Sequence, residues 1–327
     1  MTAPVPEFRL ARPSSIEEAI ALKHAHAASH FLAGGTDMLV NLRHGISAPD
    51  VLIDLSGITG LRKMETREDG VTIGAGTTIS DLTGDATIAG SYRALAQAAE
   101  AIAGPGHRVM GTVGGNLCLD TRCIYYNQSE WWRSANAYCL KHRGDTCRVA
   151  PKGARCHAAY TGDLAPALLV LNAEVEIADA GGTRRIPLSE LYVEDGRAHL
   201  ALKDGQLVTA VHLPKAPPPS LYEKVRQRGS IDYPLAGVAA ALSQADGRVG
   251  ALRIALTGTN SRPFLLDGTE RFAGRALDEQ ALQEIDKLVQ KQVQPMRTTV
   301  APANYRRIAA GAVARRIVSR LLSADGR

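Results

Sequence analysis

The chain has 327 residues, which is long enough for two or three domains of ordinary size. Hydrophobic residues make up 45% and charged residues 22%, a balance that is typical of globular proteins and excludes extended disorder. No apolar run approaches the roughly 20 residues that span a bilayer, and the first residues carry charges where a signal peptide would be apolar, so we expect a cytoplasmic protein with no membrane partner.

The net charge of +5 is concentrated in one segment. Residues 123–156 contain six Lys and Arg against two acidic residues, and the rest of the chain is close to neutral. A nucleic-acid-binding protein would be expected to carry a longer basic face. We therefore expect no nucleic acid partner.

The first 55 residues alternate helix and strand signals. Residues 13–22 read as a helix capped by serine, and residues 30–45 as a strand, a Gly-Gly turn and a second helix. Another short strand follows at 51–56. This repeated pattern predicts an α/β lobe over residues 1–55.

A second lobe is predicted over residues 56–215. It contains a strand at 70–76, an Ala-rich helix at 92–103, and apolar segments from 163 onward with a turn at 180–182. Residues 117–160 interrupt this pattern, and a structureless stretch of that length inside a compact domain usually has a function of its own. We therefore interpret 117–160 as an insertion.

A proline-rich linker at 213–220 marks the next boundary. It holds four of the sixteen prolines. Residues 216–327 then predict a small α+β domain, with a three-stranded meander that turns at Asp246-Gly247 and helices at 278–293 and 303–323. The overall fold class is thus α+β.

Two short glycine-rich segments are candidate ligand loops. Residues 33–37 read AGGTD and residues 112–116 read TVGGN, and each is expected at the end of a strand-like segment. Such loops let a backbone approach a phosphate closely, although a plain structural turn is the alternative for the first. Neither is a Walker loop or a G-x-G-x-x-G fingerprint. Two of them together suit the diphosphate of a dinucleotide such as FAD.

With these loops, the segments at 162–177 and 222–242 resemble the FAD-binding subunit of the xanthine oxidase family of molybdenum hydroxylases. The resemblance covers nearly the whole chain and implies a two-lobed FAD-binding domain of the vanillyl-alcohol-oxidase (PCMH) type. It also implies that the loop Gly229–Tyr233 lies against the isoalloxazine ring. The FAD contacts that it implies are Leu32, Ala33, Gly34, Gly35, Thr36, Asp37, Met38, Leu39, Ile102, Thr112, Gly114, Gly115, Asn116, Asp163, Val208 and Lys224.

Four cysteines stand in the insertion, spaced C-x15-C-x7-C-x8-C. Cys123, Cys139, Cys147 and Cys156 could hold a [4Fe–4S] cluster or a structural zinc, or bind no metal; spacing alone does not decide, although zinc sites usually contain close cysteine pairs. The insertion resembles that of the β subunits of 4-hydroxybenzoyl-CoA reductases, which implies a [4Fe–4S] cluster. The six cations would then offset cluster charge and attract an acidic carrier, or else simply solvate the loop.

No catalytic residue is expected in this chain, because no nucleophile or paired-carboxylate motif is present. The resemblance implies that electrons pass from ferredoxin through the cluster and FAD to a small [2Fe–2S] subunit and a large molybdopterin subunit, in an (αβγ)2 complex. A dehydrogenase passing electrons outward to NAD or a quinone, with a zinc-stapled loop, is the alternative. Cys118, in a strand-like setting, is expected to be a buried apolar residue rather than a fifth ligand. His107 is expected to be an ordinary loop residue, with an approach to the flavin as the alternative, and for Asp120 a turn role and a role near the flavin are equally open.

Overall fold

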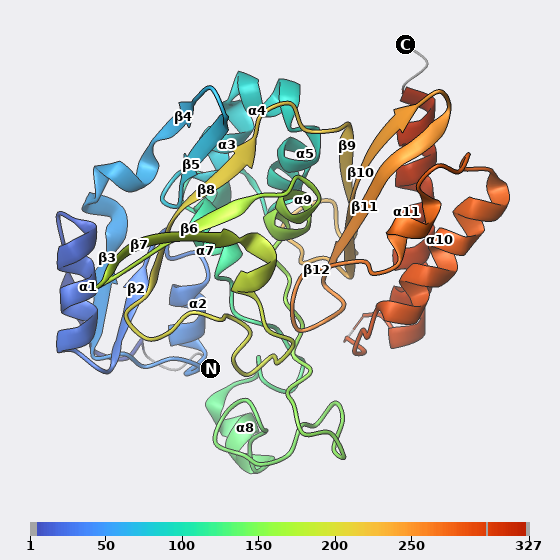
Figure 1. The fold of residues 1–327 in the computed structure, drawn as a ribbon. Coiled ribbons are helices and arrows are strands. Elements are labelled where there is room, and N and C mark those ends of the chain that lie inside the picture. Colours follow the sequence, from blue (N-terminus) through green and yellow to red (C-terminus); the bar gives the residue numbers. More distant parts are fainter. Residues whose placement is uncertain (1–4, 299, 325–327) are drawn as a thin grey trace.

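Three sheets organise the part of the chain that the computed structural model describes, residues 5–298 and 300–324 (Figure 1). The first is parallel, with strands β1 (Arg9–Ala11), β3 (Val51–Asp54) and β2 (Ser29–Leu32) in that order. Helix α1 (Ile16–Ala25) precedes β2, and the Ser15 side chain caps it by accepting a hydrogen bond from the Glu18 N–H. Helix α2 (Met38–Arg43) follows β2. The predicted order of helix, strand, helix and strand is confirmed, whereas β1 was not predicted.

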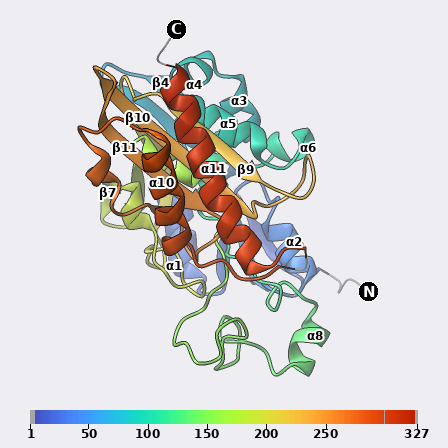
Figure 2. The same cartoon turned by 90° about the vertical axis from the view of Figure 1, so that its right-hand side faces the viewer.

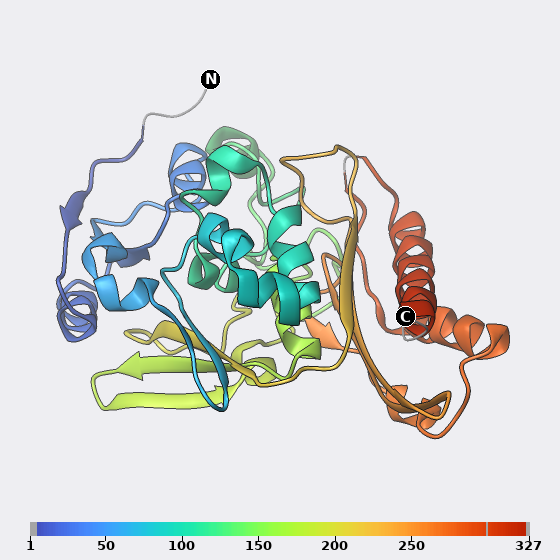
Figure 3. The same cartoon turned by 90° about the horizontal axis from the view of Figure 1, so that it is seen from above.

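The second sheet has five antiparallel strands. Their order is β4 (Met64–Thr66), β5 (Gly70–Gly74), β8 (Leu207–Pro214), β6 (Glu174–Asp179) and β7 (Gly182–Pro187). The sheet therefore joins strands from both sides of the insertion, as Figure 3 shows from above. Its helices are α3 (Ile79–Gly84), α4 (Ala86–Ser91), α5 (Arg93–Ala101), α6 (Pro105–Arg108), α7 (Val113–Leu117) and α9 (Leu164–Val170).

The third sheet belongs to the C-terminal part of the chain and differs from its prediction. It has four strands, not three: β9 (Ser220–Val225), β10 (Ala236–Ala245) and β11 (Arg248–Thr257) form the expected meander, and the two-residue β12 (Phe264–Leu265) adds an edge. A strand of two residues is too short to show an alternation of apolar and polar residues, so the sequence did not reveal it. The turn at Asp246-Gly247 is confirmed, with φ of +51° and +70°. Helices α10 (Glu279–Gln292) and α11 (Ala303–Ala324) cover this sheet (Figures 1 and 2).

Helix α9 links the second lobe to the C-terminal sheet. All seven of its residues are buried, and it contacts α5 on one side and β10 and β11 on the other. An all-apolar helix of this kind is stable only between two layers. The residue that precedes it, Asp163, is consequently placed deep inside the protein.

The insertion protrudes as a separate lobe, seen with α8 (Glu130–Ala135) at the bottom of Figures 1 and 2. Its two ends are paired, because Arg122 and Ala159 exchange backbone hydrogen bonds of 2.7 and 2.8 Å. Between these ends the described structure contains turns, one short helix and no strand of regular length. Within the described residues, no helix has the length and apolarity needed to cross a membrane.

Candidate flavin and cysteine sites

A cavity of about 690 Å³ lies between the two N-terminal lobes. That volume is within the usual range for sites that enclose a small molecule. Its walls come from the segment after β2, from the turns around α6 and α7, and from β8, while the loop 231–233 closes one edge. Residues far apart in the sequence therefore converge on one space.

The first glycine loop lies on this cavity. Residues 33–38 line it, whereas Leu32 and Leu39 do not. A Cβ on Gly34 would stand 1.7 Å from the Met110 carbonyl oxygen, so only glycine fits there. Gly35 has a φ of +71°. The first loop therefore packs directly against the backbone that leads into the second.

The second glycine loop also lines the cavity, but its conformation differs from the prediction. Gly114, Gly115 and Asn116 lie inside helix α7, and Thr112 is the N-cap, accepting a hydrogen bond of 3.1 Å from the Gly115 N–H. We expected a loop after a strand-like segment, and likewise a strand-like setting for Cys118, which is instead the C-cap of α7. Five residues with two glycines are too short for periodicity to reveal a helix. The N-terminal end of α7 supplies N–H donors to the cavity wall.

Asp163 and Lys224 form a buried ion pair at the cavity wall. Their side chains are 6% and 2% exposed, and Lys224 Nζ lies 3.1 Å from Asp163 Oδ2. The Tyr222 hydroxyl donates a hydrogen bond of 2.5 Å to the other carboxylate oxygen. Burial raises the pKa of Asp163, while Lys224 and Tyr222 oppose that rise. Asp163 lines the cavity, but Lys224 lies behind it, bound to Asp163 and to the Asp232 carbonyl.

The other predicted contacts also line the cavity. Ile102 and Val208 form part of the wall, as does His107. From the loop 229–233, residues Ile231, Asp232 and Tyr233 line it, and the Ile231 N–H donates to the Ala103 carbonyl at 3.1 Å. The structure thus brings together all sixteen predicted residues except Leu32, Leu39 and Lys224, which are not in the wall.

Several wall residues were missed from the sequence. Ala75, Gly76 and Thr78 follow β5, and a glycine directly after a strand was a usable signal for them. Thr161 had no such signal: its hydroxyl is buried at the cavity and has no hydrogen-bond partner among the described residues. A buried hydroxyl without a partner is costly, so this wall is suited to a ligand with polar groups.

The four cysteines of the insertion line a second and much smaller cavity. Its volume is about 10 Å³, close to that of a single water molecule, so the thiols face a nearly closed space. The residues around it are Cys123, Tyr125, Tyr126, Cys139, Leu140, Lys141, Cys147, Arg148, Val149, Cys156 and Ala158. Within the described residues, no group of three or more His, Cys, Asp or Glu side chains is arranged to hold a metal ion.

Burial favours the neutral form of two of these thiols, Cys123 and Cys156. Burial raises the pKa of Cys156 to about 11, while the Ala158 N–H and the Lys141 cation oppose that rise. Burial likewise raises the pKa of Cys123. Cys118 is separate: it lies in the wall of the large cavity, and burial raises its pKa to about 12. A ligand that needs thiolates must therefore supply positive charge of its own.

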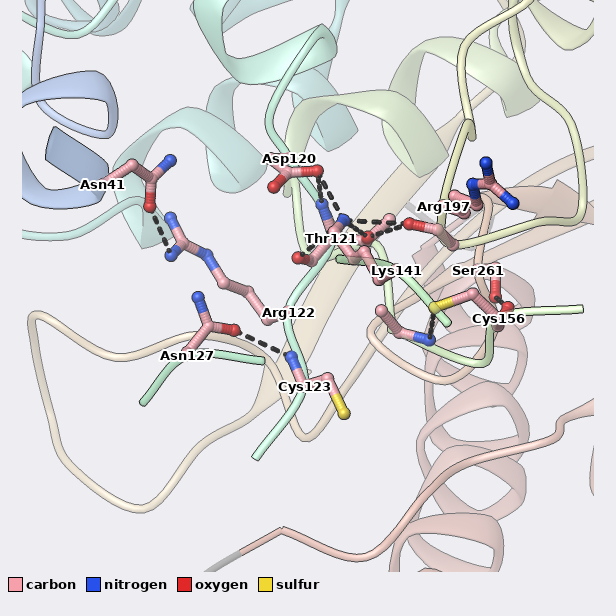
Figure 4. A network of polar contacts seen from close by, with 12 residues as sticks. Asn41, Asp120, Thr121, Arg122, Cys123, Asn127, Lys141, Cys156, Arg197 and Ser261 are labelled. Carbon is pink, nitrogen blue, oxygen red and sulfur yellow. Dashed lines mark hydrogen bonds and ion pairs between the residues drawn. The ribbon is translucent and has the colours of Figure 1, made fainter. Parts of the chain in front are cut away.

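The six cations of the insertion divide into two groups. Arg133 and Lys141 have buried side chains, 2% and 4% exposed. Arg143, Arg148 and Lys152 are exposed, and Arg155 is half-buried. Figure 4 shows Lys141 among oxygen atoms, where Nζ lies 2.7 Å from Asp120 Oδ1 and 2.9 Å from the Gly196 carbonyl. Asp120, for which the sequence left a turn role and a role near the flavin equally open, is therefore the partner of a buried cation beside the cysteine cavity.

Comparisons with known proteins agree with this geometry. Residues 6–216 match the family described as FAD binding domain in molybdopterin dehydrogenase, and residues 220–321 match the CO dehydrogenase flavoprotein C-terminal domain. The aldehyde oxidoreductase FAD-binding subunit of Escherichia coli K12 is 35% identical over 73% of this chain and 77% of its own. The carbon monoxide dehydrogenase medium chain of Afipia carboxidovorans is 28% identical over 96% of each chain.

A solved structure is similar over the full length. In reconstituted CO dehydrogenase from Oligotropha carboxidovorans, one chain superimposes with a TM-score of 0.80 at 25% identity, covering 98% of this chain and 99% of that one. The fold and the large cavity define an FAD-binding oxidoreductase subunit. More specifically, the chain belongs to the FAD-binding medium subunits of the molybdenum hydroxylase family.

Proposed function

We propose that this chain is the flavin subunit of a molybdenum enzyme of the 4-hydroxybenzoyl-CoA reductase type. FAD would be held by the two glycine loops, and a [4Fe–4S] cluster by Cys123, Cys139, Cys147 and Cys156. When bound, the cluster exchanges single electrons and the flavin exchanges one or two, so together they connect a one-electron donor to two-electron chemistry.

The observation that carries this proposal is the convergence of the four cysteines. They are spread over 34 residues, yet all four line one cavity. Four thiolates are the donor set of a cubane cluster. The insertion around them is mostly turns with one short helix, so no sheet fixes the spacing of the four thiols.

The chain's own residues prepare the two sites for charged groups. At the large cavity, the α7 N-terminus and the Thr161 hydroxyl offer donors to a diphosphate. At the small cavity, Lys141 is a buried cation that would offset negative charge on the cysteine sulfurs. Tyr126, over whose ring Lys141 Nζ lies at 4.7 Å, helps to exclude water.

The partners follow from the proposed type of enzyme. The relatives are named medium chains and FAD-binding subunits, which fits a complex with a large molybdopterin subunit and a small [2Fe–2S] subunit. We further propose a cytoplasmic (αβγ)2 assembly that receives electrons from ferredoxin and removes the phenolic hydroxyl of 4-hydroxybenzoyl-CoA. The exposed Arg143 and Lys152 offer positive charge to an acidic donor.

The decisive experiment is anaerobic purification of the complex with iron, zinc, molybdenum and flavin quantified. The proposal expects one FAD and about four irons on this chain, a reducible paramagnetic signal, and turnover of 4-hydroxybenzoyl-CoA with reduced ferredoxin. One zinc in place of the iron, with electrons leaving to NAD or a quinone, would instead establish an outward-directed dehydrogenase. The rate of reduction by ferredoxin should also fall steeply with added salt. A rate that does not change with salt would show that ferredoxin does not dock through the exposed cations of the insertion.

A further inference from the structure

Two arginines of the insertion hold the two ends of helix α2. Arg122 forms an ion pair with Asp37, the residue at the N-cap. It also donates to Asn41 Oδ1 at 3.3 Å (Figure 4). Arg133 donates to the Gly45 carbonyl at 2.6 Å, just beyond the other end of the helix. Their side chains are only 17% and 2% exposed. Both guanidinium groups are thus shielded from solvent and face acceptors at the two ends of α2, where water and salt screen their charge less than on an open surface.

Helix α2 has little else to hold it. It has six residues, of which only Asn41 and Leu42 are buried, and a helix this short is not stable by itself. The Asp37 side chain makes no capping hydrogen bond to the helix backbone. Its carboxylate is instead bound by Arg122 and by the Asn41 amide, the latter at 3.0 Å. The position of α2 therefore depends on the insertion.

The N-terminal end of α2 is the first FAD loop. Asp37 and Met38 both line the large cavity. Arg122 also lies over the ring of Tyr233, at 5.2 Å from its centroid, and Tyr233 lines the same cavity. A single side chain from the insertion thus contacts two segments of the cavity wall, the first glycine loop and the loop 231–233.

Both arginines lie on backbone that neighbours the cysteines. Arg122 immediately precedes Cys123, and its backbone is paired with Ala159 at the far end of the insertion. Helix α8, which carries Arg133, lies between Cys123 and Cys139 in the chain. A group bound by the four cysteines would fix both backbones and hence both guanidinium groups.

We propose that the insertion is a clamp on the first FAD loop, so that the cysteine cofactor and FAD strengthen each other's binding through Arg122 and Arg133. The coupling to the cysteine cofactor rests on the proposed function; the clamp itself rests on the contacts alone. Linkage is reciprocal: if the cysteine cofactor raises the affinity for FAD by some factor, FAD raises the affinity for that cofactor by the same factor. Couplings of this kind usually amount to about 5- to 150-fold in affinity.

The clamp is tested by FAD titration of the full chain, followed by quenching of flavin fluorescence. Arg122→Gln and Arg133→Gln should each weaken FAD binding at least about fivefold, and Arg122→Lys should recover part of the loss because it keeps the charge beside Asp37. Arg143→Gln is the matched control, since Arg143 is 65% exposed and pairs with Glu130 rather than with α2. Far-UV circular dichroism checks that each variant is folded. FAD affinities equal to the wild type in both glutamine variants would overturn the clamp.

The coupling is tested with Cys147→Ser, which alters the cysteine site at a residue distant in sequence from both arginines. FAD binding should weaken in this variant, and the same change in the Arg122→Gln background should add little further loss. If Cys147→Ser lowers the iron content but leaves FAD affinity unchanged, the coupling is wrong while the cluster proposal stands. If the wild-type chain contains no iron, the cluster proposal fails, and the arginine variants still decide the clamp.

Discussion

Replacing Lys224 with methionine should destabilise the protein in a pH-dependent way. The change leaves the Asp163 carboxylate buried without its cation. Across 3.1 Å, at an effective dielectric constant of ~20, the lost attraction is about 5 kcal/mol. Mutations that break one side of a buried pair cost about 3–5 kcal/mol, and we expect a loss of that size in the free energy of unfolding at pH 7. The Tyr222 hydrogen bond remains.

The pH dependence follows from the pKa of Asp163. Burial already raises this pKa in the folded protein, and removal of Lys224 takes away an opposing influence and raises it further. The folded carboxyl then binds a proton more readily than the unfolded one, so its unfavourable contribution grows as pH rises above the unfolded pKa and fades as pH falls. The difference between variant and wild type should therefore be larger at pH 8 than at pH 5.

Urea unfolding of the full chain, followed by far-UV circular dichroism, measures this loss. Tryptophan fluorescence would report only on the insertion, because both tryptophans lie there. Lys152→Met is the control for loss of an exposed lysine and should change stability by less than about 0.5 kcal/mol. In the Asp163→Asn background, Lys224→Met should lower the free energy of unfolding much less than it does in the wild-type background. A Lys224→Met variant as stable as the wild type, or a loss that does not change between pH 5 and pH 8, would refute the reasoning.

Three further outcomes are expected. Gly34→Ala places a Cβ 1.7 Å from the Met110 carbonyl oxygen, in the backbone that leads into the second loop. FAD binding in a fluorescence titration should therefore weaken at least about tenfold, or about 1.4 kcal/mol. Unchanged affinity would show that the first loop is not packed so closely against this backbone. Cys118→Ala should leave the iron content unchanged while Cys147→Ser lowers it, because Cys147 lines the small cavity and Cys118 does not. Loss of iron in Cys118→Ala would mean that Cys118 is a ligand of the cluster. Lys141→Met should shift the midpoint potential of the cysteine cofactor to more negative values by on the order of 60 mV, a tenfold change in the reduction equilibrium. Arg143→Gln removes a cation whose side chain is 65% exposed and should shift the potential much less. Equal shifts for the two variants in a redox titration would mean that the burial of Lys141 has no influence on the potential.

Local signals in the sequence were sufficient for much of the fold. The Ser15 cap and the Asp246-Gly247 turn follow from capping and turn chemistry that acts over a few residues. The two C-terminal helices follow from their amphipathic pattern. The second glycine segment did not follow, because α7 is only five residues long and is stabilised by its Thr112 cap and by contacts with Ala75. The fourth strand of the C-terminal sheet, β12, was missed for the same reason: it pairs with β11 over two residues.

The sequence by itself determined which groups the protein can offer: two glycine loops, four clustered cysteines and a basic insertion. It also determined the resemblance to the family, which rests on these motifs and on their order along the chain. Only the tertiary structure decided which of these groups meet. It placed Lys224 behind Asp163 instead of in the cavity wall, separated Cys118 from the other cysteines, and brought Arg122 onto Asp37. Such contacts join residues up to 85 positions apart, and no local periodicity encodes them, because they depend on how buried layers such as α9 pack.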